Sequence, residues 1–208
     1  MTDSDYQQKK QSIIEEITTA FDGVSRENGV SLHEAMAIDN YESAEERTKA
    51  RAEDTEMRWQ EVPDDAIRFL DAVLSFLDAK GFRYYTPAYL VWYLKYMDSK
   101  EPDFWSNTFD HIEFTLDISP LRDFNSRTWT GEVLTSEQKK FLEKKAAEIK
   151  AHESEIGALK MKRFHTLTPE QCKAIAHFLE FVHEQDKKWN SPQSTAKKAL
   201  DSYWQRFL

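Results

Sequence analysis

The residue types best suited to chemistry gather around one arginine in the first half of the chain. Arg83 is followed directly by Tyr84 and Tyr85, with Tyr89 further along and Asp78 before it. A guanidinium presents a planar set of donors that fits a carboxylate or a phosphate, and neighbouring tyrosines add hydroxyls and ring faces. The segment therefore predicts an anion pocket. In the alternative interpretation, Asp78 pairs with Arg83 across a turn while the tyrosines pack between two helices.

A second group of polar residues, Asp39, Arg51 and Asp54, precedes that segment. Arg51 and Asp54 are expected on one face of a helix over residues 44–59. If folding brings Asp39 or Asp54 against Arg83, the result is a buried ion-pair network or a catalytic acid beside an anion clamp. Removing one partner from a buried pair costs about 3–5 kcal/mol, which favours a structural network, but the sequence leaves both open.

Motifs for other chemistries are incomplete. Glu180 and His183 form a single Glu-x-x-His, whereas a di-iron bundle needs two such motifs and two further carboxylates. His177 is six residues from His183 and falls on another helix face. Cys172 is the one cysteine, and no Gly-x-Ser-x-Gly elbow is present. We expect no metal site, no cofactor and no identifiable catalytic residue.

The composition predicts a mainly α fold. Glycine provides 5 of 208 residues, below its usual share of about 7%, which disfavours glycine-rich phosphate loops and many tight β-turns. We expect a compact helical domain around a central helical hairpin, with at most one short strand pair.

The charge distribution narrows the classes of partner. The chain has 28 Lys and Arg against 37 Asp and Glu, a net charge of −9, and its first hundred residues hold 20 acids and 12 bases. Because no dense basic cluster occurs, we expect no nucleic-acid partner. No apolar run approaches the roughly 18 residues of a membrane span, so we expect no membrane contact. The acidic half could meet a basic partner or keep the protein in solution.

The expected compartment is the cytoplasm. A single cysteine cannot form an internal disulfide, which fits a reducing environment. The first residues are acidic and polar, unlike the basic start and apolar run of a secretion signal.

The central hairpin is predicted from two apolar segments and the residues between them. Residues 67–77 are apolar around most of a helix, and Gly81 is placed where that helix would stop. Pro87 would open the second helix, over residues 88–97. Residues 112–118 alternate apolar and polar side chains, which predicts a strand.

Helix starts and domain limits complete the prediction. Ser31 with Glu34, and Thr168 with Gln171, have capping-box spacing. We expect one helical domain over residues 1–187, with residues 124–160 as an insertion, and a linker and amphipathic helix over 188–208. The apolar stripe of that last helix must dock on the domain or on a second subunit as a homodimer; it comprises Leu200, Tyr203, Trp204 and Phe207.

The segment Ser75–Leu90 carries a more specific signal, reading Ser-Phe-Leu-Asp-Ala-x-Gly-Phe-Arg-Tyr-Tyr-x-Pro-Ala-Tyr-Leu. This signature resembles an uncharacterised bacterial family of small proteins classed as a domain of unknown function. The resemblance extends roughly over residues 10–100 and 163–182. It implies a fold and supplies no mechanism.

Two functions follow as hypotheses. The preferred one is a protein-interaction module in the bacterial cytoplasm with an unidentified protein partner, because signatures of catalysis are missing. Its candidate contact surfaces are the acidic first half of the chain and the aromatic C-terminal helix. The alternative is an enzyme or small-molecule sensor that binds an anionic ligand at Arg83, Tyr84 and Tyr85.

Overall fold

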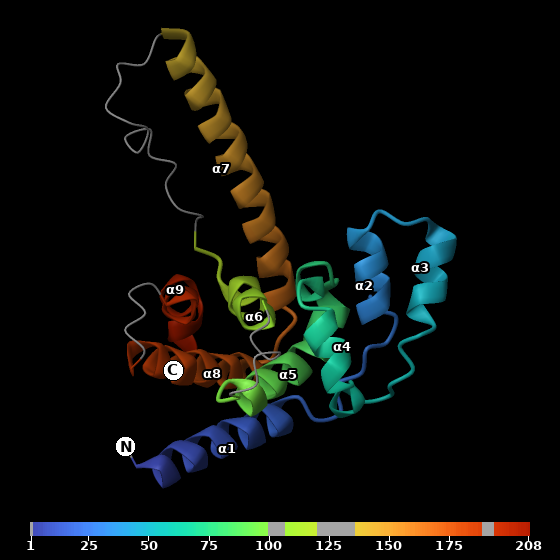
Figure 1. The fold of residues 1–208 in the computed structure, drawn as a ribbon, viewed down its shortest axis with the longest axis vertical. Helices are drawn as coiled ribbons and strands as arrows, with labels where there is room; N and C mark the ends of the chain where they lie inside the picture. Colours follow the sequence, from blue (N-terminus) through green and yellow to red (C-terminus); the bar gives the residue numbers. More distant parts are fainter. Residues whose placement is uncertain (1, 100–106, 120–135, 189–193) are drawn as a thin grey trace.

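The computed structural model describes residues 2–99, 107–119, 136–188 and 194–208 (Figure 1). These residues form helices and connecting turns and contain no strand, so the mainly α prediction is confirmed for the described part of the chain. The α-helices are α1 Asp3–Ala20, α2 Leu32–Asp39, α3 Ala44–Arg51, α4 Asp64–Phe69, α5 Ala79–Tyr96, α6 Thr108–Leu116, α7 Ser136–Phe164, α8 Pro169–Lys188 and α9 Thr195–Ser202, with short 3-10 turns at Trp59–Glu61, Val73–Ser75 and Trp204–Phe207.

Helix α5 occupies the centre of the body, and its course corrects the predicted hairpin. Asp78 begins it as the N-cap, accepting a hydrogen bond from the Gly81 amide at 2.8 Å. Gly81 is therefore in the first turn of α5 and does not end a helix. A side chain there would place its Cβ 2.3 Å from the Val30 carbonyl oxygen, so close packing explains the glycine. Pro87 lies inside the same helix, where burial on all sides offsets its missing donor.

The apolar segment before α5 is also more compact than predicted. Helix α4 ends at Phe69, and the chain then folds back through the 3-10 turn at Val73–Ser75. This path still buries Leu70, Leu74 and Leu77. The core residues of this run were thus predictable only in part, because Phe69 and Phe76 are exposed, and the single long helix over 67–77 is wrong.

The predicted strand over residues 112–118 is wrong because these residues lie mostly in helix α6. Ile112 and Leu116, four residues apart, are both buried and mark one helix face. A short run of alternating residues fits both the two-residue period of a strand and the 3.6-residue period of a helix. A lone strand would also leave its backbone groups without partners.

The last helix docks on its own chain. Trp204 is fully buried, and its indole N–H donates to the Leu116 carbonyl at 2.8 Å. Its ring is 4.6 Å from that of Phe164, between centroids. Leu200 and Tyr203 are buried and Phe207 is packed against the core. Docking on the domain, the first of the two predicted alternatives, accounts for this stripe.

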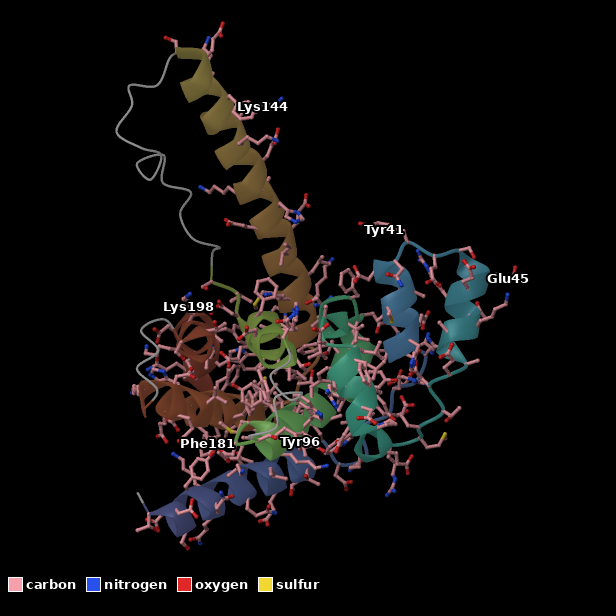
Figure 2. The ribbon with its side chains drawn as sticks, viewed as in Figure 1. Tyr41, Glu45, Tyr96, Lys144, Phe181 and Lys198 are labelled. Carbon is pink, nitrogen blue, oxygen red and sulfur yellow. The ribbon has the colours of Figure 1, made fainter. Side chains whose placement is uncertain are left out.

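Two outer parts of the molecule, the α2–α3 pair and α7, differ in how closely they pack against the other helices. Helices α2 and α3 lie side by side at one flank, where Tyr41 and Glu45 reach the surface, and α7 extends far from the body with Lys144 near its outer end (Figure 2). Residues 136–160 of the predicted insertion belong to α7, while 124–135 and the linker residues 189–193 lie outside the described residues. Within the described ranges, every helix is too short or too polar to cross a bilayer.

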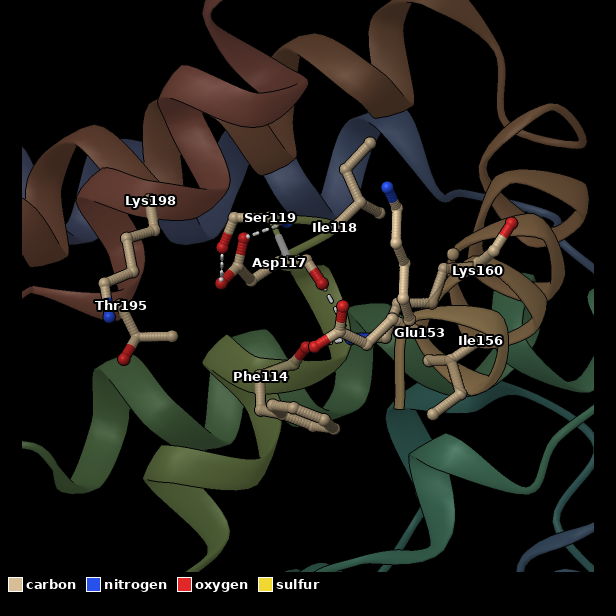
Figure 3. A pocket seen from close by; sticks show the side chains of 12 residues that line it. Phe114, Asp117, Ile118, Ser119, Glu153, Ile156, Lys160, Thr195 and Lys198 are labelled. Atoms are coloured by element: carbon tan, nitrogen blue, oxygen red, sulfur yellow. Dashed lines mark hydrogen bonds between the residues drawn. The ribbon is translucent and has the colours of Figure 1, made fainter. Parts of the chain in front are cut away.

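A cavity of about 790 Å³ opens where α6, α7 and α9 meet (Figure 3). Phe114, Ile118 and Ile156 give it apolar walls, and Lys160 lies in its lining although only 5% of that residue is exposed. The Lys160 ammonium donates to the carbonyl oxygens of Phe114 at 2.5 Å and Asp117 at 2.6 Å. It therefore caps the carboxyl end of α6.

A buried carboxyl joins α6 to two other helices. Glu113 accepts a hydrogen bond from the Tyr93 hydroxyl of α5 at 2.6 Å and from the Ala196 amide of α9 at 3.0 Å. Burial raises the pKa of Glu113 to about 7, the charges of Asp186 and Asp110 add to the rise, and the two hydrogen bonds oppose it. The protonated form is thus favoured in the folded state.

This raised pKa makes stability depend on pH. Glu113 binds its proton more tightly when folded, so its contribution is complete below its ordinary pKa of 4.5 and is lost as pH rises to about 7. Chemical denaturation across pH 4.5–7 should show Glu113→Gln losing a slope of up to about 1.4 kcal/mol per pH unit. Asp65→Asn, exposed on α4 and not among the charges that act on Glu113, should keep the slope. An unchanged slope in Glu113→Gln would contradict the assignment.

The corrected start of α5 can be tested at its cap. Asp78 also accepts from the Val30 amide, at 3.0 Å. Asp78→Ala should therefore lower the free energy of unfolding by about 1–2 kcal/mol in urea titrations. Asp39→Ala, at the exposed end of α2, is the control. Equal losses in the two variants would argue against the cap.

Candidate functional site

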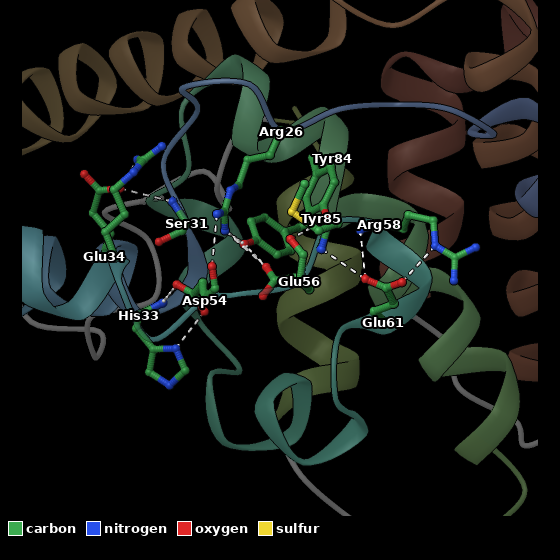
Figure 4. Close-up of polar contacts among 12 residues, drawn as sticks. Arg26, Ser31, His33, Glu34, Asp54, Glu56, Arg58, Glu61, Tyr84 and Tyr85 are labelled. Atoms are coloured by element: carbon green, nitrogen blue, oxygen red, sulfur yellow. Dashed lines mark hydrogen bonds and ion pairs between the residues drawn. The ribbon is translucent and has the colours of Figure 1, made fainter.

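Three chain segments converge on Tyr85 of α5 in a polar network (Figure 4). Arg26, from the loop between α1 and α2, donates to the Tyr85 hydroxyl at 2.5 Å and to the Glu56 carboxylate at 3.1 Å. The same guanidinium donates to the Asp54 carbonyl at 3.1 Å. The Tyr85 hydroxyl donates to Glu56, and the Tyr84 hydroxyl donates to the Glu56 carbonyl at 3.3 Å. The arginine and the two tyrosines thus share one acidic partner segment.

Asp54 extends the network to the start of α2. Its residue is 8% exposed, and its carboxylate accepts from the His33 backbone amide at 2.9 Å and contacts His33 Nδ1 at 2.7 Å. The backbone contact satisfies one of the amides that a helix leaves without a partner in its first turn. His33 Nε2 lies 3.8 Å from the Glu53 carboxylate. A histidine held by an aspartate can serve as a base, but here both ring nitrogens face carboxylates.

Arg51 connects α3 to α2 at the edge of this network. Its guanidinium contacts the Glu34 carboxylate at 2.5 Å, and Glu34 also accepts from the Ser31 amide at 3.2 Å. Glu34 thus makes its half of the capping box predicted at Ser31, whereas the Ser31 hydroxyl has no hydrogen-bond partner among the described residues. Ion pairing therefore holds the α2–α3 pair together where few apolar residues are available, since α3 has no buried residue.

Burial keeps the phenols of the network protonated. It raises the pKa of Tyr84 to about 12, with the nearby Glu56 charge adding to the effect. It also raises the pKa of Tyr85, helped by the hydrogen bond and charge of Glu56. Burial alone would lower the pKa of Arg26, but its contacts with Tyr85 and Glu56 reverse this and raise it. At neutral pH the network holds one guanidinium against carboxylates, which is an arrangement for holding segments in place.

The remaining predicted site residues lie elsewhere. Arg83 faces α8, where its Nε donates to Gln171 Oε1 at 3.2 Å. Tyr89 is fully buried and donates to the Leu70 carbonyl at 2.8 Å. Asp78 caps α5, so the predicted turn and its Asp78–Arg83 pair are replaced by a helix start, and Asp39 is exposed at the end of α2. The structure therefore gathers Asp54, Tyr84 and Tyr85, with Arg51 at their edge, and separates the other four.

The cation that the tyrosines contact was missed by sequence reasoning. Arg26 lies in a polar loop with no periodic pattern, and Glu56 is 30 residues away from it. The predicted helix over 44–59 hides this contact, because α3 ends at Arg51 and the following loop turns Asp54 and Glu56 inward. The one available signal was the acidic cluster at residues 53–56.

The residues considered for metal or covalent chemistry have structural surroundings. His177 Nδ1 lies 2.7 Å from the Glu16 carboxylate of α1. Burial raises the pKa of Cys172 to about 11, which keeps its thiol protonated. Among the residues with described side chains, no three of the metal-ligating types His, Cys, Asp and Glu come together.

The network predicts that replacing Arg26 destabilises the protein more than replacing Arg83. Arg26→Met should lower the free energy of unfolding by about 3–5 kcal/mol, because it leaves the largely buried Glu56 carboxylate without its counter-charge. Adding Glu56→Gln should recover part of the loss. Arg83→Met, whose contact is a neutral amide, is the matched control and should cost less in urea titrations. Arg26→Met behaving like Arg83→Met would contradict a buried ion pair.

Comparison with known proteins identifies the family but no activity. No curated protein and no solved structure matches the chain. A model of a family of unknown function, DUF6714, matches residues 9–155 and 143–208. The matched ranges include residues 124–160 and the tail beyond 188, as well as the central signature of α5. The chain belongs to this family, DUF6714, whose function is unknown.

Proposed function

We propose that this protein is a protein-interaction module of the bacterial cytoplasm, with α7 as its contact element. The observation that carries the proposal is the projection of this 29-residue helix away from the other helices (Figure 1). At 1.5 Å per residue it is about 44 Å long. Its carboxyl end is anchored to the body, which leaves its outer part for another molecule.

The outer part of α7 gains little packing from the described part of its own chain. Its described side chains between residues 136 and 152 are exposed, and Phe141 has 59% of its surface accessible. Local ion pairs, such as Lys145 with Glu148 at 2.8 Å, contribute only about 0.3–0.5 kcal/mol each. Helix stability in proteins comes mainly from packing an apolar face, and a partner that covers Phe141 would supply that packing.

The partner chemistry that fits is an apolar groove with acidic residues at its rim. Phe141 would enter the groove, and exposed Lys140, Lys144 and Lys145 lie close to it in sequence. Helix-in-groove recognition uses such apolar anchors on one helix. The cytoplasmic location is supported by the single cysteine, which leaves no internal disulfide to form.

The alternative, an anionic ligand at Arg83, Tyr84 and Tyr85, has less support. Tyr84 and Tyr85 are buried and contact Glu56, which would repel an anion. Arg83 is on another side of α5 and donates to Gln171. We therefore retain the interaction module as the proposed function.

The test is affinity capture with matched phenylalanine variants. The immobilised protein is incubated with lysate of its own source cells, and captured proteins are quantified by mass spectrometry. Phe141→Ser should reduce capture of the specific partner at least about tenfold, the effect of losing one buried aromatic anchor. Phe69→Ser is the control, because Phe69 is 73% exposed on α4, in another part of the molecule.

Two results would overturn the proposal. One is a captured set that Phe141→Ser and Phe69→Ser change equally. The other is the absence of any protein enriched over a blank resin. Circular dichroism of both variants checks that a loss of capture does not come from unfolding.

A further inference from the structure

The cavity at the junction of α6, α7 and α9 is built differently from the polar network. Twelve residues of the described part of the chain line it, and three of them are lysines, Lys150, Lys160 and Lys198. Asp117 and Glu153 supply two acids. The lining therefore carries a formal excess of one positive charge in a chain whose net charge is −9. Because the charge of this lining is opposite in sign to the net charge of the chain, the cavity favours an anionic ligand.

The two acids of the lining are not equivalent. The Asp117 carboxylate accepts from the Ser119 amide at 2.8 Å, from the Ser119 hydroxyl at 2.7 Å and from the Ser202 hydroxyl at 3.3 Å. The oxygens of the Asp117 carboxylate thus accept hydrogen bonds from groups of the same chain. Glu153 lies in the lining on α7, and its charge would oppose a ligand with two negative charges more than a ligand with one.

Lys160 supplies the buried cation of the cavity. An ammonium has three donors, and within the described chain Lys160 uses two of them on the carbonyl oxygens of Phe114 and Asp117. The third N–H has no hydrogen-bond acceptor among the described residues, and the Phe114 ring lies beside the ammonium. Burial lowers the pKa of Lys160 to about 8, so the amine is still mostly charged at neutral pH. The charge of Asp117 already favours the ammonium form, and a ligand anion would add to that effect.

The walls set the shape of the ligand. Phe114, Ile118 and Ile156 offer an apolar surface, and the Phe114 ring centroid is 3.9 Å from the Lys160 ammonium. The volume of about 790 Å³ lies within the range of small-molecule sites, about 300–1,000 Å³. Among the described lining residues there is no arginine, so this part of the lining lacks the paired donors typical of phosphate recognition.

We propose that this cavity binds an amphipathic monocarboxylate, with its carboxylate at Lys160 and its apolar body against Phe114, Ile118 and Ile156. This site is separate from the partner surface around Phe141 of α7. Failure of one proposal therefore leaves the other standing.

The experiment compares an acid with the alcohol of the same chain length. Decanoate and 1-decanol, each below its aggregation limit, are titrated into the full-length protein at pH 7 by calorimetry. The wild type should bind decanoate about tenfold or more tightly than decanol, because one charge-assisted hydrogen bond distinguishes them. Lys160→Met keeps the apolar stem and should remove this preference, whereas Lys162→Met, exposed and outside the lining, should keep it.

A second variant separates binding from folding. Gly157 lines the cavity, and a Cβ at this position would meet no atom within 4 Å. Gly157→Phe should therefore fold, place its ring in the open space and weaken decanoate binding about tenfold or more. Ala158→Phe adds the same ring one residue away, outside the lining, and should bind as the wild type does.

Three results would overturn the proposal. The first is no heat of binding with decanoate at millimolar concentration. The second is equal affinity of the wild type for acid and alcohol. The third is a folded Gly157→Phe variant that binds decanoate as tightly as Ala158→Phe.

Discussion

The buried hydroxyls of α5 place the strongest constraint on the surrounding chain. Four tyrosines, Tyr84, Tyr85, Tyr89 and Tyr93, are buried along this helix. Each ring contributes apolar burial, but each hydroxyl must find a partner or lose about 1–3 kcal/mol. The partners come from four places: the Glu56 carbonyl, the Glu56 carboxylate with Arg26, the Leu70 carbonyl and the Glu113 carboxylate. The surrounding segments are held in position by satisfying these hydroxyls.

This constraint explains why many residues of the types used in catalysis make structural contacts in this network instead. Arg26, Glu56 and Asp54 use their charges on one another and on backbone groups. A catalytic or ligand site needs groups that are both positioned and accessible, and these groups are positioned but already engaged. The same reasoning directs attention to the periphery, where Lys160 retains a donor and α7 retains an exposed phenylalanine.

The sequence was informative where the cause of a structure is local. Low glycine content and the capping boxes at Ser31 and Thr168 are local properties, and the structure has the full box at Thr168 and the Glu34 half of the box at Ser31. Gly81 and Pro87 led to wrong helix boundaries, because the packing that explains these residues is not local in the sequence. Gly81 packs on Val30, 51 residues earlier in the chain. Pro87 is buried inside α5, which no local pattern reveals. The contact between Arg26 and Tyr85 spans 59 residues, so only the folded chain could show it. Lys160 left a fainter signal, since it stands between the apolar residues Ile156 and Phe164 at four-residue spacing.

The contacts that anchor the carboxyl end of α7 also affect where its outer end lies. Its last turns are fixed by three contacts: Lys160 on the end of α6, Arg163 donating to the Ser75 carbonyl at 2.6 Å, and the Phe164 ring against Trp204. The cavity lies directly beside this anchor, because Ile156 and Lys160 line it. A ligand there would contact the base of the same helix whose outer part carries Phe141. A rigid helix transmits a change of angle at its base over its whole length, so the anchor around Lys160 determines where the outer surface points.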